Sequence, residues 1–250
     1  MSIALFDVQA GFGGPKYGET EVVTAGDWAR EMRRLDIEGA LVRIMPDGLV
    51  RDPPDANEDL FAACEEHPAM VPCPILIPAG AHDVPSEAEQ VATAVARGAG
   101  AAFLRPEMDL WDLDEWCSGR LFAALEARRL PAFCSAGKFT FSQVADVARR
   151  YPALPLILAE VHYLNQRRIV PLLAAFANVF LSMGSNYVVF QGLELIVGEL
   201  GPERVLFGTG FPQAEPMGAI MQLAYAGIPD DAKRLIGRGN AARLMEGIQR

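Results

Sequence analysis

The 250-residue sequence predicts an α/β fold in which eight strand–helix units close into a single (β/α)8 barrel. Short apolar runs alternate with amphipathic stretches along the whole chain, which is the pattern of repeated βαβ units. Several runs are almost continuously apolar, as in a parallel sheet covered on both faces. A length of 250 residues suits one such barrel, and no low-complexity linker divides residues 1–250 into separate domains. A doubly wound open sheet is the alternative architecture.

Eight candidate strands and the helices between them can be placed on the sequence. Ser86-x-x-Glu89 forms a capping box before an alanine-rich helix that ends near Gly98. Thr140, or alternatively Ser142, is placed to cap a helix that ends before Pro152. Further helices are expected after Asp55, Pro216, Pro229 and Asn240. The candidate strands are Leu5–Gln9, Ala40–Ile44, Val71–Ile77, Ala101–Arg105, Ala132–Ser135, Leu156–His162, Val179–Met183 and Val205–Thr209.

Composition and charge argue against a disordered chain, a nucleic-acid-binding protein and a membrane protein. The chain is 51% hydrophobic and 22% charged, which favours a sizeable core over disorder. Its formal net charge is −10, and no basic run offsets that charge, so we expect no nucleic-acid partner. Residues 169–193 lack charged side chains, but Pro171, Asn178 and Gly184 interrupt them, so we expect no membrane span.

The cysteines and the first residues indicate a reducing compartment. None of the four cysteines forms a Cys-x-x-Cys pair, and a chain of this size does not need disulfides. The first residues lack the basic and apolar regions of a secretory signal. We therefore expect a cytoplasmic location.

A motif near the C-terminus carries a family resemblance. Phe207-Gly208-Thr209-Gly210-Phe211-Pro212 resembles the Phe-Gly-Ser/Thr-Asp-x-Pro signature of the metal-dependent amidohydrolase-2 family, with Gly210 at the place of the aspartate. Asp7-Val8-Gln9-Ala10-Gly11 stands where the family has Asp-x-His-x-His. Asn240-Ala241-Ala242-Arg243-Leu244 is similar to its terminal helix, and Leu104-Arg105-Pro106 to the exit of its fourth strand. The resemblance implies a TIM barrel with a site at the carboxyl ends of the strands, and it is compatible with a homodimer.

The resemblance also implies which positions would hold the family's divalent metal, such as zinc. They are Gln9, Gly11, Cys134, Glu160 and Gly210, and none of them is a histidine. A glutamine and a glycine do not replace two imidazoles as zinc ligands. We therefore predict no metal cofactor of the family's ordinary kind. A weak, non-standard metal site built from Asp7, Glu160 and His162 is the alternative.

The polar residues at the predicted strand ends are the candidate site. Side chains alternate along a strand, so Glu160 and His162 are expected on one face, with Cys134 ending the neighbouring strand. These three are the candidate catalytic residues. Each also has a structural interpretation: Cys134 as a core residue, His162 as a partner of a loop carbonyl, and Glu160 as the ion-pair partner of Arg105. Candidate substrate-binding residues are Gln9, Arg105, Asn186 and Thr209.

Two classes of function remain open at this point. The first is an enzyme, a divergent amidohydrolase-like hydrolase or lyase that acts on a small molecule, with Glu160 and His162 as acid and base. The second is a non-catalytic barrel that binds a small molecule or a partner protein. Fold alone does not choose between them, because function resides in the site.

Overall fold

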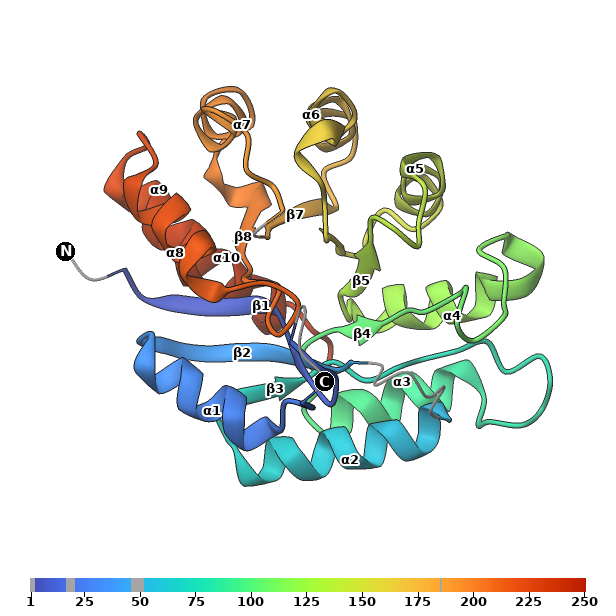
Figure 1. The fold of residues 1–250 in the computed structure, drawn as a ribbon. Coiled ribbons are helices and arrows are strands. Elements are labelled where there is room, and N and C mark those ends of the chain that lie inside the picture. Colours follow the sequence, from blue (N-terminus) through green and yellow to red (C-terminus); the bar gives the residue numbers. More distant parts are fainter. Residues whose placement is uncertain (1–2, 17–20, 46–51, 185) are drawn as a thin grey trace.

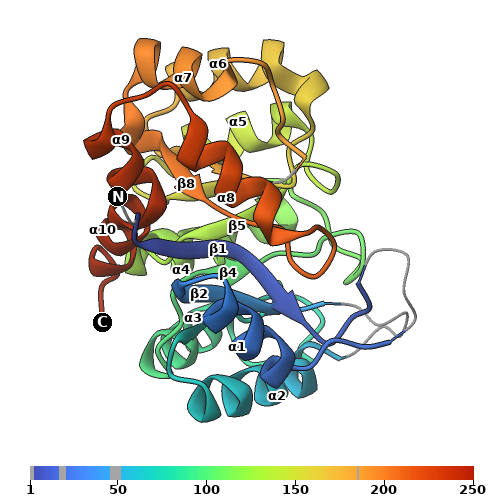
Figure 2. The ribbon, with the colours of Figure 1, turned by 60° about the vertical axis from the view of Figure 1, so that its left-hand side comes forward.

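The computed structural model describes residues 3–16, 21–45, 52–184 and 186–250, and it confirms the predicted barrel. Eight strands alternate with helices, and Figure 1 shows the helices around the strands in chain order. The strands are β1 (Leu5–Phe12), β2 (Ile37–Ile44), β3 (Met70–Pro72), β4 (Ala102–Phe103), β5 (Ala132–Ser135), β6 (Leu156–Ala159), β7 (Val179–Met183) and β8 (Val205–Phe207). In Figure 2, β1 runs away from the side on which the C-terminus lies.

All strand pairs are parallel, in the orders β1-β2-β3 and β4-β5-β6-β7-β8. A parallel bridge between Ile75 and Phe103 links the two sheets on one side. On the other side, the backbone N–H of Gly210 donates to the carbonyl of Gln9 at 3.0 Å. The strand ends are therefore held in one ring, and the residues that follow the strands gather at one end of the barrel.

Where a helix-start signal was predicted from the sequence, the observed helix begins at or near it. Both predicted helix caps form, and each is a capping box, at Ser86 and Thr140. A third capping box, between Thr24 and Asp27, begins a helix that was not predicted from the sequence. The helices are α1 (Ala25–Arg34), α2 (Pro53–Glu66), α3 (Glu87–Ala96), α4 (Glu115–Arg128), α5 (Phe141–Arg150), α6 (Gln166–Ala175), α7 (Gly192–Leu200), α8 (Pro216–Tyr225), α9 (Asp230–Arg234) and α10 (Asn240–Glu246), with 3₁₀ turns at Tyr163–Asn165 and Pro202–Arg204 and a π-helical turn at Leu235–Gly239.

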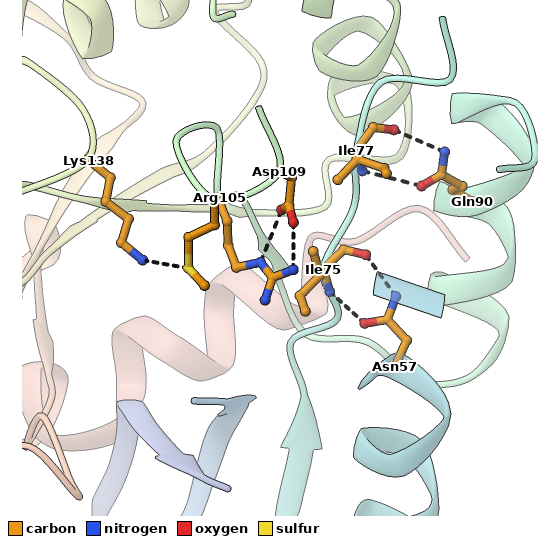
Figure 3. Close-up of polar contacts among 8 residues, drawn as sticks. Asn57, Ile75, Ile77, Gln90, Arg105, Asp109 and Lys138 are labelled. Carbon is orange, nitrogen blue, oxygen red and sulfur yellow. Dashed lines mark hydrogen bonds and ion pairs between the residues drawn. The ribbon is translucent and has the colours of Figure 1, made fainter. Parts of the chain in front are cut away.

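Amide side chains hold the wall of the barrel where β3 ends early. The Asn57 amide of α2 exchanges two hydrogen bonds with the backbone of Ile75, at 2.7 and 2.8 Å. The Gln90 amide of α3 does the same with Ile77, at 3.0 and 3.3 Å (Figure 3). These bonds satisfy backbone groups that a regular strand partner would otherwise satisfy. The predicted strand Val71–Ile77 therefore becomes a short strand followed by an anchored segment.

The interior of the barrel and the inner faces of the helices form one apolar core. Residues of β1, β5, β6, β7 and β8 are buried along their full lengths. This burial explains the continuous apolar runs, since the helices cover the outer face and side chains fill the inner one. None of the helices in the described ranges has the length and apolar character needed to cross a bilayer.

Candidate active site

A cavity of about 300 Å³ lies at the carboxyl ends of the strands. It is the place where a barrel of this type usually carries its chemistry. Polar and charged side chains from several strand ends and loops surround it. Its lining is formed by Gln9, Arg43, Met45, Phe103, Lys138, Glu160, Gly184, Asn186, Gly210, Gln213 and Ala214.

Glu160 and Arg43 form the charged centre of the cavity. Strand β6 ends at Ala159, and Glu160 has a left-handed backbone with φ of 57°. Its carboxylate accepts a hydrogen bond from Nη1 of Arg43 at 3.3 Å. The Arg43 guanidinium is buried between the rings of Phe103 and Phe133, 4.8 and 4.1 Å from their centroids. Its Nε has no hydrogen-bond partner among the described residues. Arg43 thus lines the cavity as a fixed cation, and its Nε–H is a hydrogen-bond donor that no described residue uses.

The electrostatics of the cavity keep Glu160 ionised. Burial raises the pKa of Glu160, but the charge of Arg43, the nearby Ser135 hydroxyl and the charge of Lys138 outweigh it. The net pKa therefore lies below the ordinary value of 4.5. Glu160 is consequently a carboxylate at neutral pH. It can accept a proton or a hydrogen bond from a bound molecule.

A buried hydrogen-bond network closes the barrel mouth where β1 meets β7 and β8. Asp7 accepts bonds from the backbone N–H groups of Gln9 and Thr209, at 2.8 and 3.0 Å, and from the Thr209 hydroxyl. The Gln9 side-chain oxygen accepts a bond from the Ser182 hydroxyl at 2.8 Å. Burial raises the pKa of Asp7, and these hydrogen bonds lower it only in part. Thr209, predicted as a substrate-binding residue, is fully buried in this network.

Besides Thr209, three more of the predicted site residues lie outside the cavity. Arg105 is buried and pairs through two hydrogen bonds with Asp109, at 2.6 and 3.0 Å (Figure 3). The expected pair between Arg105 and Glu160 is therefore wrong, and Arg43 is the partner of Glu160. Cys134 is buried in β5, and burial raises its pKa to about 12, which opposes thiolate formation. His162 is exposed, accepts the N–H of Leu164 through Nδ1, and lies against the Tyr163 ring.

The left-handed backbone at Glu160 explains the position of His162. The expectation that Glu160 and His162 share a face assumed an extended strand as far as His162. The strand stops at Ala159, so the alternation that the argument required is broken. Gln9, Asn186 and Glu160 line the cavity, and their roles in binding and catalysis stay predictions.

The residues at the family's metal positions do not fit a divalent cation. Gln9 bonds Ser182, the Cys134 thiol is buried with a raised pKa, and Glu160 faces the cation of Arg43. The other two positions, Gly11 and Gly210, offer no side chain. The described residues contain no group of three or more His, Cys, Asp or Glu side chains placed to hold a metal. A guanidinium beside the candidate carboxylate ligand also repels a second cation.

A parallel (β/α)8 barrel with a polar cavity at the carboxyl ends of its strands defines an enzyme-like class of proteins. The family model described as amidohydrolase matches residues 33–246. The chain therefore belongs to the amidohydrolase family, as the resemblance of the Phe207–Pro212 segment implied. A search of curated protein sequences finds no match.

Solved structures with the same fold cover nearly the whole chain. A TIM-barrel protein from Bordetella bronchiseptica is 17% identical, with a TM-score of 0.76 and 100% of both chains covered. A 5-carboxyvanillate decarboxylase from Sphingomonas paucimobilis is 16% identical, with a TM-score of 0.74 and 98% and 99% coverage of this chain and that one. Another, from Novosphingobium aromaticivorans with bound manganese, is 12% identical, with a TM-score of 0.76 and 98% and 97% coverage. At these identities the likeness establishes the fold.

Two charged residues of the cavity, Arg43 and Lys138, were not predicted from the sequence, and neither was Gln213. Arg43 lies inside a strand that reads as an apolar run, and Lys138 lies in the loop after β5. A charged residue at the carboxyl end of a predicted barrel strand is the signal that could have identified Arg43. Lys138 carried no comparable local signal.

Proposed function

We propose that this amidohydrolase-family protein is a hydrolase or lyase that acts on a small molecule in the barrel cavity without a resident metal. The observation that carries the proposal is the ion pair of Arg43 with Glu160, at a position where the family has a metal ligand. The buried guanidinium supplies positive charge at the place where the family relies on a metal. The proposal treats residues 1–250 as one barrel domain.

The side chains of the cavity support a division of roles. Glu160 is the general base, because it is an ionised carboxylate that lines the cavity. Arg43 stabilises the negative charge that develops on a substrate oxygen. Gln9, Asn186 and Gln213 orient the bound molecule by hydrogen bonding. We assign no proton-transfer step to His162 or Cys134, since neither lines the cavity.

The second candidate function is a non-catalytic barrel that binds a small molecule. The observation in its favour is that Glu160 already has a partner in Arg43, so the pair also serves to hold β2 and β6 together. Turnover distinguishes the two candidates, because both predict ligand binding in the same cavity.

The test is an activity screen on protein treated with a strong chelator. The panel contains 5-carboxyvanillate, related hydroxylated aryl carboxylates for decarboxylation, and aryl esters for hydrolysis. We expect turnover of at least one compound that survives chelation and falls by about 100-fold or more in Glu160→Gln. The matched control is His162→Ala, which retains wild-type turnover. Binding without turnover, or turnover that returns only with added manganese or zinc, would contradict the proposal.

We further propose that the protein is a cytoplasmic homodimer. Its four cysteines are free, three of them buried, which suits a reducing compartment. Large apolar side chains are exposed near the barrel mouth, among them Leu164, Val188 and Phe190, which are 73%, 66% and 91% exposed. Such exposed groups are typical of protein interfaces. Light scattering on the purified protein tests the dimer, and a monomer at micromolar concentration would exclude it.

A further inference from the structure

Lys138 stands apart from the other cations of the chain. Only three of the 22 Lys and Arg residues are lysines, namely Lys16, Lys138 and Lys233. Lys16 lines a surface depression beside α1, and Lys233 donates to the carbonyl of Ala224 at an exposed position. Lys138 is the lysine that lines the candidate active site. A lysine differs from an arginine in one respect that matters here, because it can lose its proton and become a nucleophile.

The surroundings of the Lys138 amine are largely apolar. Its Nζ lies 3.7 Å from the Met108 sulfur and 5.6 Å from the centroid of the Phe103 ring. Figure 3 shows the Lys138 side chain separate from the ion pair of Arg105 and Asp109. Within the described part of the chain, Lys138 forms no ion pair within 4.0 Å. The amine is thus held in a defined place against a sulfur atom and an aromatic ring.

Burial of the Lys138 amine also favours its neutral form. Burial lowers the pKa of Lys138; Glu160 and Glu107 oppose this, while Arg43 and Arg105 add to it, and the net pKa is lowered. Each unit by which a lysine pKa falls leaves about ten times more of the amine neutral at a given pH. An amine activated in this way is a recognised means of forming an imine with a carbonyl substrate.

Lys138 also lies between two spaces. It lines the 300 Å³ cavity with Arg43 and Glu160, and it lines a neighbouring groove of about 700 Å³ formed by the loops after β4 and β5. Trp111 and Phe141 supply apolar surface to that groove, and Arg168 supplies a cation. A molecule whose reacting carbon lies at Lys138 can therefore place an anionic end beside Arg43 and its remaining part in the groove.

We propose that Lys138 is a catalytic nucleophile that forms an imine with the carbonyl carbon of a carboxylate-bearing substrate. This inference rests on the proposed function and specifies its lyase form. The amine lone pair makes the N–C bond while the C=O π electrons move to oxygen. One proton passes from nitrogen to that oxygen by way of Glu160, which gives a carbinolamine. A second proton, from solvent, lets the hydroxyl leave as water and leaves one positive charge on the C=N⁺ group.

The experiment traps the imine on the intact wild-type protein. The probe is pyruvate with sodium cyanoborohydride at neutral pH, because the hydride reduces an iminium to a stable secondary amine. Intact mass and peptide mapping then give the extent and position of labelling. We expect one adduct on Lys138, at least about tenfold faster than on Lys16 or Lys233. Methyl pyruvate, which has the same ketone without the charge, should lose most of this selectivity.

The Lys138→Arg variant separates the two proposals. It retains the positive charge and removes the nucleophilic amine, so it should give no adduct at that position and should lose lyase turnover. Equal labelling of the three lysines, or labelling that spares Lys138, would overturn the inference. If Lys138→Arg keeps full chelator-resistant turnover in the activity screen, the inference also fails, whereas the proposed function stands.

Discussion

The two sides of the barrel mouth use their polar residues differently. On the β1–β8 side, Asp7, Thr209 and Ser182 are completely buried. Asp7 accepts bonds from the Thr209 backbone and hydroxyl, and the Ser182 hydroxyl donates to the Gln9 side chain. On the β2–β5–β6 side, Arg43 and the half-buried Glu160 face the cavity. The first arrangement holds the ends of the barrel together, and the second places charge where a small molecule can meet it.

The two carboxylates show what the difference means. Asp7 lies within β1 and Glu160 directly follows β6. Burial raises the pKa of Asp7, whereas the charge of Arg43 helps to lower the pKa of Glu160. A polar residue at the end of a barrel strand is thus not by itself evidence of catalysis. Its partners decide whether it closes the structure or carries chemistry.

The largest expected effect on stability comes from the β1–β8 side. Asp7→Ala leaves the N–H groups of Gln9 and Thr209 and the Thr209 hydroxyl without their acceptor. We expect a loss of about 3 kcal/mol in the free energy of unfolding, measured by urea denaturation. A loss below about 1 kcal/mol would show that this network is not structural.

The Arg43–Glu160 pair gives the next largest effect. Arg43→Met removes the cation beside a half-buried carboxylate, and we expect it to cost about 2 kcal/mol after allowance for the partial exposure of Glu160. The double variant Arg43→Met/Glu160→Gln should recover part of this loss, because no unpaired charge remains. Additive losses in the double-mutant cycle would mean that the two side chains do not interact.

The pH dependence of stability should have opposite signs at the two carboxylates. The folded pKa of Glu160 is lowered, so its stabilising contribution is present above pH 4.5 and is lost as the pH falls through the folded pKa. The folded pKa of Asp7 is raised, so its contribution is present below pH 3.8 and is lost as the pH rises through the folded value.

The amide variants Glu160→Gln and Asp7→Asn keep the side-chain shape but cannot ionise, so each isolates the contribution of one carboxylate. Stability relative to Glu160→Gln should fall as the medium becomes more acidic, and stability relative to Asp7→Asn should fall as it becomes less acidic. If the stability difference between wild type and variant changes with pH in the same direction for Glu160→Gln and Asp7→Asn, the contrast between the two carboxylates is wrong.

The smallest effects are expected at two residues outside the cavity. His162→Ala changes an exposed side chain, so stability should stay within about 0.5 kcal/mol. Cys134→Ala removes a buried sulfur and should cost about 1 kcal/mol. Turnover in the activity screen should stay near the wild-type value for both. A large loss of turnover in either variant, with the fold intact, would restore that residue to the catalytic set.

The sequence predicted the scaffold better than the site because the two depend on different information. Apolar runs such as Ala132–Ser135 and Val179–Met183 coincide with strands, since burial on both faces is recorded in composition. The partners of Glu160 depend on which strands are neighbours and on a left-handed residue at the end of β6. Arg43 lies 117 positions away, so no local pattern connects it with Glu160.

At Gly210 the sequence shows which residue is present, and the structure adds the backbone conformation, which the sequence does not show. The sequence alone revealed that the family's aspartate is replaced there. The structure adds that Gly210 has φ of 81°, a conformation that side-chain-bearing residues rarely adopt. A single Gly210→Asp change is therefore expected to strain the loop rather than to rebuild a metal site.

We propose above that the Arg43 guanidinium, held beside Glu160, supplies the positive charge that a metal ion supplies elsewhere in the family. Elemental analysis of the purified protein, made together with turnover before and after exhaustive chelation, tests it most directly. We predict no stoichiometric transition metal and unchanged turnover. One tightly held metal per chain, with activity that disappears on chelation and returns with that metal, would contradict the claim.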